Sequence, residues 1–390
     1  MSLRFFETAD KAACCGCSAC EAACPVSAIH MARDEEGFAY PVLDRKKCIE
    51  CGRCQKVCPI ENGNDPQPAV AAYAAVHRDA GLLKKSSSGG VFTALAEEVI
   101  RSGGIVFGAV MENNKVFHCK AETVEQLAPM RGSKYVQSDM GQTMQAVKLA
   151  IQEGKQVLFS GTPCQCAAVD KLIGKNNPNL LTLDFVCHGV PSPAVFDSYV
   201  RWLSEKHGTD VDFLAFRAKL PDKIGIYETY RYQQKQKTRA AYDSKYLTGF
   251  MGGLIYRHAC YTCPYATKER SSDITMCDYW GCEKYHPELD TVKGVSAVIV
   301  STQKGAAWLE KAAASLQLVP TTVGQIASGN ANLVHATPKP QERDGFYAAW
   351  KRMDFDTVAE KYLTDKQAWK KRLIAKIPKR VKRMLKTLMR

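Results

Sequence analysis

The chain has 390 residues, of which 46% are hydrophobic and 24% are charged, and this composition is typical of a globular protein with two or three domains. No stretch of about 18 consecutive apolar residues occurs, so the sequence predicts no membrane-spanning helix. The N-terminus lacks the apolar core of a signal peptide, so we expect a cytoplasmic protein. The net charge of +13 is concentrated after residue 365, where eleven basic residues and no acidic residue occur. The remaining chain is nearly neutral, which argues against a body that binds nucleic acid.

Seventeen cysteines occur in clusters along the chain. In a reducing cytoplasm such clusters indicate metal ligands or redox centres rather than disulfides. The N-terminal segment contains the pattern C-x2-C-x2-C-x3-C-P twice, at an offset of 34 residues. The cysteines of the first copy are Cys14, Cys17, Cys20 and Cys24, and those of the second copy are Cys48, Cys51, Cys54 and Cys58.

In this spacing, three thiolates bind one 4Fe–4S cluster and the fourth, held by the proline-terminated turn, reaches the other cluster. The pattern resembles that of bacterial two-cluster ferredoxins over about residues 10–62. The resemblance implies two ligand sets, which are Cys14, Cys17, Cys20 with Cys58, and Cys48, Cys51, Cys54 with Cys24. Zinc is the alternative, although zinc sites usually separate two cysteine pairs by a longer gap. Cys15 does not keep the repeat offset, and we interpret it as a bystander thiol. Between the copies, residues 27–34 and 37–44 predict two short strands joined by a turn.

A polar stretch rich in Pro, Gly and Asn predicts a domain boundary at residues 61–70. After it, apolar runs that predict strands alternate with patterns that predict helices, and two further strands follow that we expect to be antiparallel. We therefore expect an α+β or α/β fold in which a mixed-sheet body follows a small ferredoxin-like domain. The expected parts are a ferredoxin domain at 1–62, a linker at 63–70, a body at 71–345 and a helical, basic tail at 346–390. No G-x-G-x-x-G fingerprint follows any predicted strand, so a standard dinucleotide-binding site is not supported.

The body contains a second group of cysteines. Cys164 and Cys187 each follow a predicted strand, whereas Cys260 and Cys263 form a C-x2-C hook. These ligands would come from distant parts of the chain, so the spacing alone leaves a third four-thiolate site and buried structural thiols equally open.

Eight segments of the body occur in an order that resembles the beta subunits of coenzyme F420-reducing hydrogenase and F420H2 dehydrogenase. Plant 7-hydroxymethyl chlorophyll a reductase is similar too. The segments are SSSGGVFTAL (86–95), RGSKYVQSDM (131–140), SGTPCQ (160–165), VCHGVPSP (186–193), FRAK (216–219), YRHACYTCPYA (256–266), DITMCDYWG (273–281) and KGVSAVIV (293–300). The resemblance covers about residues 1–320. It implies FAD and a body 4Fe–4S cluster on Cys164, Cys187, Cys260 and Cys263, which makes three 4Fe–4S clusters in total. Cys277 stands where the family usually has Gly, and it or Cys282 is an alternative ligand.

The flavin contacts follow from the same resemblance. The SSSGG stretch precedes a predicted helix, and backbone N–H groups at a helix start suit a pyrophosphate. Without the resemblance, an ordinary helix cap with a glycine-rich turn is the favoured interpretation. The expected cofactor-binding residues are Ser87, Ser88, Gly89, Gly90, Lys134, Tyr135, Gln137, Ser138, Gly161 and Thr162. The expected catalytic residues are Lys134, His188 and Asp278. Lys134 would stabilise the reduced anionic flavin, His188 would relay a proton and Asp278 would shape the substrate mouth. A structural histidine and a structural turn are the alternatives for the last two.

The end of the chain combines the basic residues with apolar residues at spacings of three and four, interrupted by Pro378. This basic amphipathic pattern suits an anionic membrane surface at the inner face of the membrane. Docking to a partner protein and a solvated tail are the alternatives. No aromatic platform accompanies the charges, so we expect no nucleic-acid binding.

These features predict a FAD-dependent iron–sulfur oxidoreductase. A flavin exchanges either one or two electrons, whereas a 4Fe–4S cluster exchanges one. We expect electrons to pass between a hydride carrier, such as reduced coenzyme F420, and ferredoxin or a partner enzyme. A link to surface-polysaccharide synthesis follows from the resemblance to bacterial relatives, and a homo-oligomer is compatible with the sequence. The alternatives are a non-catalytic subunit that relays electrons for a partner enzyme and a zinc-stabilised interaction module.

Overall fold

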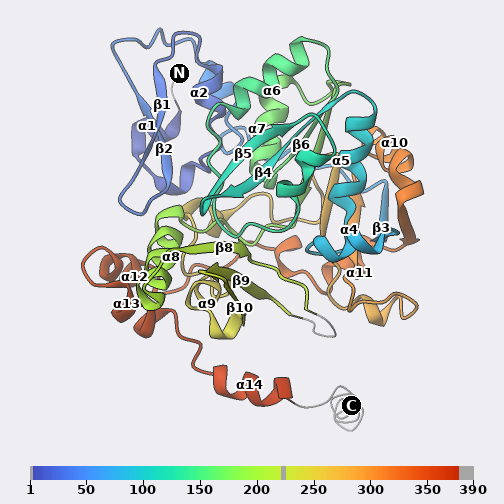
Figure 1. Ribbon diagram of the computed structural model, residues 1–390. Helices are drawn as coiled ribbons and strands as arrows, with labels where there is room; N and C mark the ends of the chain where they lie inside the picture. Colours follow the sequence, from blue (N-terminus) through green and yellow to red (C-terminus); the bar gives the residue numbers. More distant parts are fainter. Residues whose placement is uncertain (1–2, 221–224, 377–390) are drawn as a thin grey trace.

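The computed structural model describes residues 3–220 and 225–376 (Figure 1). Its largest element is an eight-stranded sheet with the order β13-β3-β12-β11-β7-β6-β4-β5. The strands β11, β7, β6 and β4 run parallel, whereas the pairs on either side of them are antiparallel. The predicted mixed-sheet body is therefore confirmed. Its strands are β3 (Ala71–His77), β4 (Ile105–Glu112), β5 (Lys115–Ala121), β6 (Val157–Ser160), β7 (Leu180–Phe185), β11 (Ile274–Asp278), β12 (Ser296–Val300) and β13 (Leu316–Pro320).

Helices cover both faces of this sheet because successive strand residues point to opposite sides. Val106 and Leu158 pack on one face against α5 and α10, whereas Phe107 and Phe159 pack on the other face against α6 and α7. The bounds of these helices are α5 (Val91–Arg101), α6 (Thr143–Gln152), α7 (Pro163–Ile173) and α10 (Gln303–Ala312). Shorter helices lie between the strands or follow the last one, and they are α4 (Ala80–Lys85), α11 (Val323–Ala327) and the 3-10 helices η2 (Glu125–Met130), η5 (Cys282–Lys284), η6 (Ala313–Ser315) and η7 (Ala331–Leu333).

The N-terminal unit lies beside α6 and α7 (Figure 1). Its predicted strands form an antiparallel hairpin that turns at Gly37, where φ is +84°. The short helix α2 lies within the first cysteine repeat and contains Cys20. It packs on α6 and α7, and its counterpart α3 packs on α2. The elements of the unit are α1 (Arg4–Thr8), η1 (Lys11–Ala13), α2 (Ala19–Ala23), β1 (Ile29–Arg33), β2 (Ala39–Leu43) and α3 (Arg53–Lys56).

A separate three-stranded antiparallel sheet has the order β10-β9-β8. The two antiparallel strands that the sequence predicts here are β8 and β9, and β10 adds a third. Ser192 caps the adjoining helix α8, because its side chain accepts a hydrogen bond from the Val195 backbone. The elements here are α8 (Pro193–His207), β8 (Val211–Ala215), β9 (Tyr227–Tyr232), β10 (Lys235–Ala240), η3 (Ala241–Asp243), α9 (Lys245–Met251) and η4 (His258–Thr262).

The C-terminal helices α12 (Arg343–Trp350) and α13 (Phe355–Tyr362) pack into the body rather than form a tail. Phe346 of α12 and Phe38 of the N-terminal unit belong to one hydrophobic core. The sequence places boundaries near residues 62 and 346, but the segments on both sides of these boundaries share that core. Helix α14 (Ala368–Lys376) has the exposed apolar side chains that the tail prediction requires, and residues 377–390 lie outside the described part of the chain.

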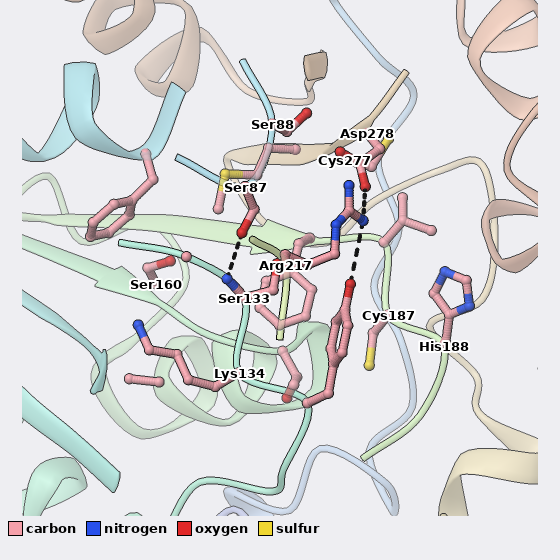
Figure 2. Close-up of a pocket in the computed structure, with 18 of the residues that line it drawn as sticks. Ser87, Ser88, Ser133, Lys134, Ser160, Cys187, His188, Arg217, Cys277 and Asp278 are labelled. Carbon is pink, nitrogen blue, oxygen red and sulfur yellow. Dashed lines mark hydrogen bonds and ion pairs between the residues drawn. The ribbon is translucent and has the colours of Figure 1, made fainter. Parts of the chain in front are cut away.

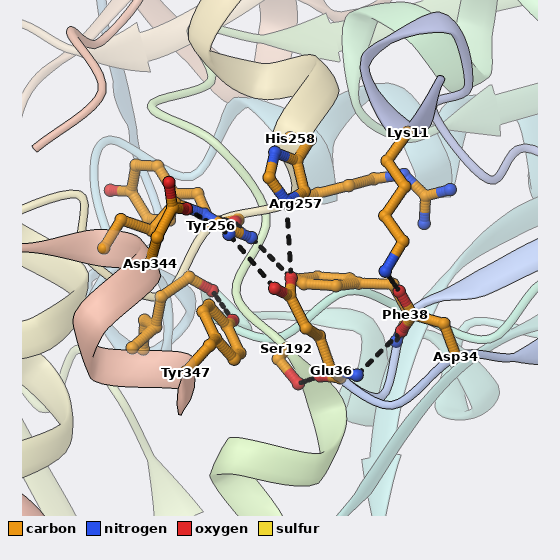
Figure 3. A network of polar contacts seen from close by, with 12 residues as sticks. Lys11, Asp34, Glu36, Phe38, Ser192, Tyr256, Arg257, His258, Asp344 and Tyr347 are labelled. Atoms are coloured by element: carbon orange, nitrogen blue, oxygen red, sulfur yellow. Dashed lines mark hydrogen bonds and ion pairs between the residues drawn. The ribbon is translucent and has the colours of Figure 1, made fainter. Parts of the chain in front are cut away.

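A buried ion pair joins the N-terminal hairpin to helix α12. Arg343, which is 0% exposed, donates a hydrogen bond to the Glu36 carboxylate at 2.6 Å. His258 lies 3.7 Å from the same carboxylate (Figure 3). Although burial opposes ionisation, the hydrogen bonds from His258 and Arg343 lower the pKa of Glu36 to about 2. Among residues 3–220 and 225–376, none of the helices has the length and hydropathy that crossing a bilayer requires.

Candidate functional site

A cavity of about 340 Å³ opens at the carboxyl ends of the parallel strands β6 and β7. Its walls include the loop after β6, the loop at 185–191 after β7, the glycine-rich turn before α5 and the end of β11. Figure 2 shows side chains from these segments facing one another across the cavity. In α/β sheets, the carboxyl edge of the strands is the usual place for a ligand.

Most of the predicted cofactor-binding and catalytic residues line this one cavity. They are Ser87, Ser88, Gly90, Lys134, Tyr135, Ser138, Gly161, Thr162, His188 and Asp278. Two predicted residues do not line it. Gly89 packs against the sheet, because a Cβ atom there would lie 2.1 Å from the Ala75 carbonyl oxygen. Gln137 faces a second cavity, described below.

The glycine-rich turn is held in a defined shape. Gly90 caps α5 at a φ of +85°, a conformation that favours glycine. Ser87 Oγ accepts a hydrogen bond from the Ser133 N–H at 2.7 Å, which joins the two predicted flavin-binding loops (Figure 2). Lys219 Nζ donates to the carbonyls of Leu83 and Ser88 at 2.7 Å. The turn therefore presents a rigid helix start to the cavity, which fits a pyrophosphate group.

Lys134 provides a cation whose charge depends on its surroundings. Its Nζ donates to the carbonyl oxygens of Pro129 at 2.8 Å and Arg131 at 2.9 Å. Burial lowers the pKa of Lys134 to about 7. The side chain is therefore only partly charged at neutral pH and would gain charge when an anionic group binds beside it.

Arg217 is a cavity residue that the sequence analysis did not single out. Its Nη1 donates to the Asp278 carboxylate at 2.6 Å and to the Tyr135 hydroxyl at 3.4 Å (Figure 2). Tyr135 in turn stacks on Phe250 with a centroid separation of 4.2 Å. The FRAK segment of the family resemblance contains Arg217 and could have pointed to it. Only the fold shows that this arginine turns toward Asp278 rather than toward solvent.

The second, smaller cavity is lined by all four predicted ligands of the body cluster, which are Cys164, Cys187, Cys260 and Cys263. Burial raises the pKa of Cys260 to about 12 and that of Cys263 to about 11. Four thiols around one space are the donor set of a 4Fe–4S cluster. Within the described ranges, no three Cys, His, Asp or Glu side chains are grouped so as to hold a single metal ion.

The two alternative ligands lie elsewhere. Cys277 lines the large cavity, and Cys282 is fully buried in a core with Tyr279 and Ile326. Neither lines the smaller cavity. The structure therefore groups the quartet that the resemblance implied rather than either substitute.

The large and small cavities share a wall. Thr162, Gln165 and the loop at 187–190 line both of them. His188 lies in this shared loop, and burial lowers its pKa. A flavin in the large cavity and a cluster on the four cysteines would therefore be immediate neighbours.

The N-terminal repeat is visible in the backbone. Gly16 and Ser18 have positive φ angles, and so do Glu50 and Gly52, which occupy the same positions of the second copy. These left-handed residues lie between successive cysteines at equivalent positions of the two copies. Cys20 interacts electrostatically with Cys14, Cys17 and Cys58, and Cys54 does so with Cys48 and Cys51. The interaction of Cys20 with Cys58 is the one that the predicted exchange of the fourth ligand requires for the first set.

Cys15 and Arg257 join the N-terminal unit to the body. The spacing of the cysteines along the sequence does not identify either residue as such a contact. The Cys15 thiol is hydrogen-bonded to the thiols of Cys164 and Cys17, and it lines the smaller cavity. Arg257, which is 0% exposed, donates from Nε to the Cys14 carbonyl at 2.7 Å. Its Nη1 donates to Gln137 at 3.2 Å, and the Gln137 amide donates to the Cys15 carbonyl at 3.0 Å.

Family models match both the N-terminal unit and the body. Residues 154–323 match the family model for the C terminus of the coenzyme F420 hydrogenase/dehydrogenase beta subunit. Residues 13–62 and 40–119 match two models described as 4Fe-4S dicluster domains. These matches confirm the resemblances to the beta-subunit family and to two-cluster ferredoxins. None of the curated proteins compared with the chain is a match.

One solved structure that is similar to this chain is the xenon-derivatised F420-reducing NiFe hydrogenase complex from Methanosarcina barkeri. A chain of it aligns with a TM-score of 0.46 and 18% sequence identity, over 69% of this chain and 90% of that chain.

Proposed function

We propose that this protein is a FAD-dependent oxidoreductase. Residues 154–323 match the coenzyme F420 hydrogenase/dehydrogenase beta-subunit family, and a 4Fe–4S dicluster domain precedes them. The protein would exchange electrons between a hydride carrier and one-electron protein carriers. The observation that carries this proposal is the wall shared by the large cavity and the four-cysteine cavity. A two-electron group and a one-electron group are useful together only where they are neighbours.

The residues of the large cavity suit a bound flavin in complementary ways. The turn at 87–90 offers backbone N–H groups to the pyrophosphate. Lys134 supplies a cation that an anionic flavin would stabilise, and Tyr135 on Phe250 forms a flat aromatic wall. When bound, FAD supplies hydride chemistry at its ring together with one-electron exchange.

The Arg217–Asp278 pair at the cavity fits a role in orienting the second reactant. Arg217 lies under the exposed Trp280 ring, with its guanidinium carbon 5.5 Å from the ring centroid. A reduced deazaflavin such as coenzyme F420 is the donor that the family favours. One reduced deazaflavin would give up a hydride and a proton, which amount to two electrons and two protons, so that two one-electron acceptors are reduced and two protons are released.

Anaerobic purification followed by iron, sulfide and flavin quantitation tests this proposal. We expect one FAD and about twelve irons per chain, for three clusters of four irons. Reduced F420, NADH and NADPH are then added to identify a donor that bleaches the flavin. Clusters without a bound flavin would contradict the proposal and leave the relay subunit as the function, and a colourless protein would leave the zinc-stabilised module.

Two narrower expectations rest on the sequence alone. The link to surface-polysaccharide synthesis comes from the family resemblance. Peripheral membrane binding depends on the basic end of the chain, of which α14 is described and residues 377–390 are not. Sedimentation of the full chain with anionic and with neutral vesicles measures the second.

A further inference from the structure

We propose that the surface formed by residues 44–56, here named the outer repeat, is the docking site for a small acidic electron-transfer protein. This inference rests on the proposed function above, and it adds to that function the partner's chemistry and the place where the partner binds. Three observations carry it: the order of the cysteine sets, the exposure of the outer repeat and its charge.

The two N-terminal cysteine sets are not equivalent in their distance from the body. Cys17 is buried and belongs to the same core as residues of α6 and α7. Cys15 is hydrogen-bonded both to Cys17 and to Cys164, which lines the body cavity. The first repeat is therefore the inner one, in contact with the cysteine site of the body.

The outer repeat faces solvent. Cys51 is exposed, whereas Cys48 and Cys54 are half-buried. Ile49, between Cys48 and Cys51, is 60% exposed, and Val42 just before the outer repeat is 43% exposed. Exposed apolar side chains beside a cysteine set that reaches the surface are what an electron-transfer contact requires, because electrons pass between proteins over short distances only.

Positive charge surrounds these apolar side chains. The exposed basic residues of the outer repeat are Arg45, Lys46, Lys47, Arg53 and Lys56. The segment contains two acidic residues, Asp44 and Glu50. Asp44 accepts a hydrogen bond from the Lys46 N–H at 3.0 Å and lies 3.8 Å from Lys47 Nζ, so its carboxylate is engaged within the turn. An apolar centre with a basic rim is complementary to a partner with an acidic rim.

The test measures how fast the protein reduces an acidic plant-type 2Fe–2S ferredoxin. The full chain with its clusters is reduced with stoichiometric dithionite, separated from excess reagent and mixed anaerobically with the oxidised ferredoxin. We expect Arg45→Glu/Lys46→Glu to lower the second-order rate constant by at least about tenfold at about 20 mM salt, and the loss to shrink to about twofold at about 500 mM. Lys235→Glu/Lys237→Glu, on the exposed strand β10, is the matched control and should change the rate less than twofold.

Several outcomes would overturn the docking site. One is an unchanged rate in the Arg45→Glu/Lys46→Glu variant, and another is an equal loss in the β10 control. A shifted reduction potential with an unchanged association rate would assign the basic residues to tuning the cluster instead. A basic acceptor, cytochrome c, should be reduced no more slowly by the variant, and a loss with both acceptors would indicate a damaged cluster. The electrons come from dithionite, so the result does not depend on whether FAD or a hydride donor is found.

Discussion

The thiol of Cys15, in the N-terminal repeat, is hydrogen-bonded to the thiol of Cys164, at the start of helix α7 in the body. This contact lowers the pKa of Cys164, because Cys15 donates the hydrogen bond. It joins the first ferredoxin-type ligand set to the body quartet. A thiol interpreted as a bystander from its spacing thus lies between two predicted cluster sites.

The first prediction separates ligands from neighbours. Cys164→Ala should lower the iron content by about four atoms per chain, because the body cluster loses a ligand. Cys15→Ala should keep about twelve irons, because Cys15 contacts ligands without replacing one. Iron and sulfide quantitation with electron paramagnetic resonance measures both variants. Loss of about four irons in Cys15→Ala would show instead that Cys15 is a ligand.

The second prediction concerns Arg257, whose guanidinium donates to the carbonyls of Cys14 and Ala39 and lies 4.0 Å from the Tyr40 ring centroid. Arg257→Met should lower the free energy of unfolding by about 3 kcal/mol, because buried acceptors lose their donors. It should also move the potential of the nearest cluster to more negative values, because a positive charge that favours the reduced state is removed.

Thermal unfolding and a potentiometric titration measure the two effects of Arg257→Met. Arg231→Met is the control, since this arginine forms an exposed pair with Asp212, and its effect should stay within about 1 kcal/mol. A loss of stability without a change of the reduction potential would show that Arg257 has a structural role only.

The third prediction uses the pKa of Lys134, which is about 7 in the protein without a ligand. If anionic FAD binds beside Lys134, it raises this pKa, so that binding takes up a proton. The affinity for FAD should then be highest below pH 7 and should weaken by up to about tenfold for each pH unit above it. Fluorescence titration of the flavin-free protein at pH 6, 7 and 8 measures this dependence. Lys134→Met should bind FAD more weakly and without the pH dependence, and an equal dependence in that variant would assign it to another group.

The fourth prediction concerns the buried pair of Glu36 and Arg343 (Figure 3). Glu36→Ala should lower the free energy of unfolding by about 3–5 kcal/mol, because it leaves the Arg343 charge buried without its partner. The neighbouring Glu35→Ala removes exposed pairs with Lys11 and Lys351 and should cost less than about 1 kcal/mol. The midpoint of thermal unfolding ranks the two variants, and equal midpoints would contradict the importance of the buried pair.

The acid dependence of the same pair has a definite sign. The pKa of Glu36 is about 2 in the folded chain, below its value of about 4.3 in an unfolded one. The stability that Glu36 contributes is therefore complete above about pH 4.3 and is lost as the pH falls toward 2. The difference in unfolding midpoint between the wild type and Glu36→Ala should shrink over this range.

The sequence alone determined the features that depend on neighbouring residues. The cysteine spacing of the two repeats indicates their ligand chemistry, because three predicted ligands of each cluster lie in one short segment of the chain. The hairpin around Gly37, the alternation of strands and helices and the cap at Ser192 also follow from local patterns, and the structure agrees with them.

Only the tertiary structure decided the relationships between distant segments. It groups Cys164, Cys187, Cys260 and Cys263 around one cavity, turns Arg217 toward Asp278 and places Gln137 beside Arg257 rather than in the large cavity. It also packs α12 and α13 into the hydrophobic core, although the sequence analysis assigned most of this segment to a tail. These outcomes depend on the long-range contacts that form when the sheet, the repeats and the C-terminal helices pack together. Residue spacing along the chain does not specify which of these surfaces come into contact.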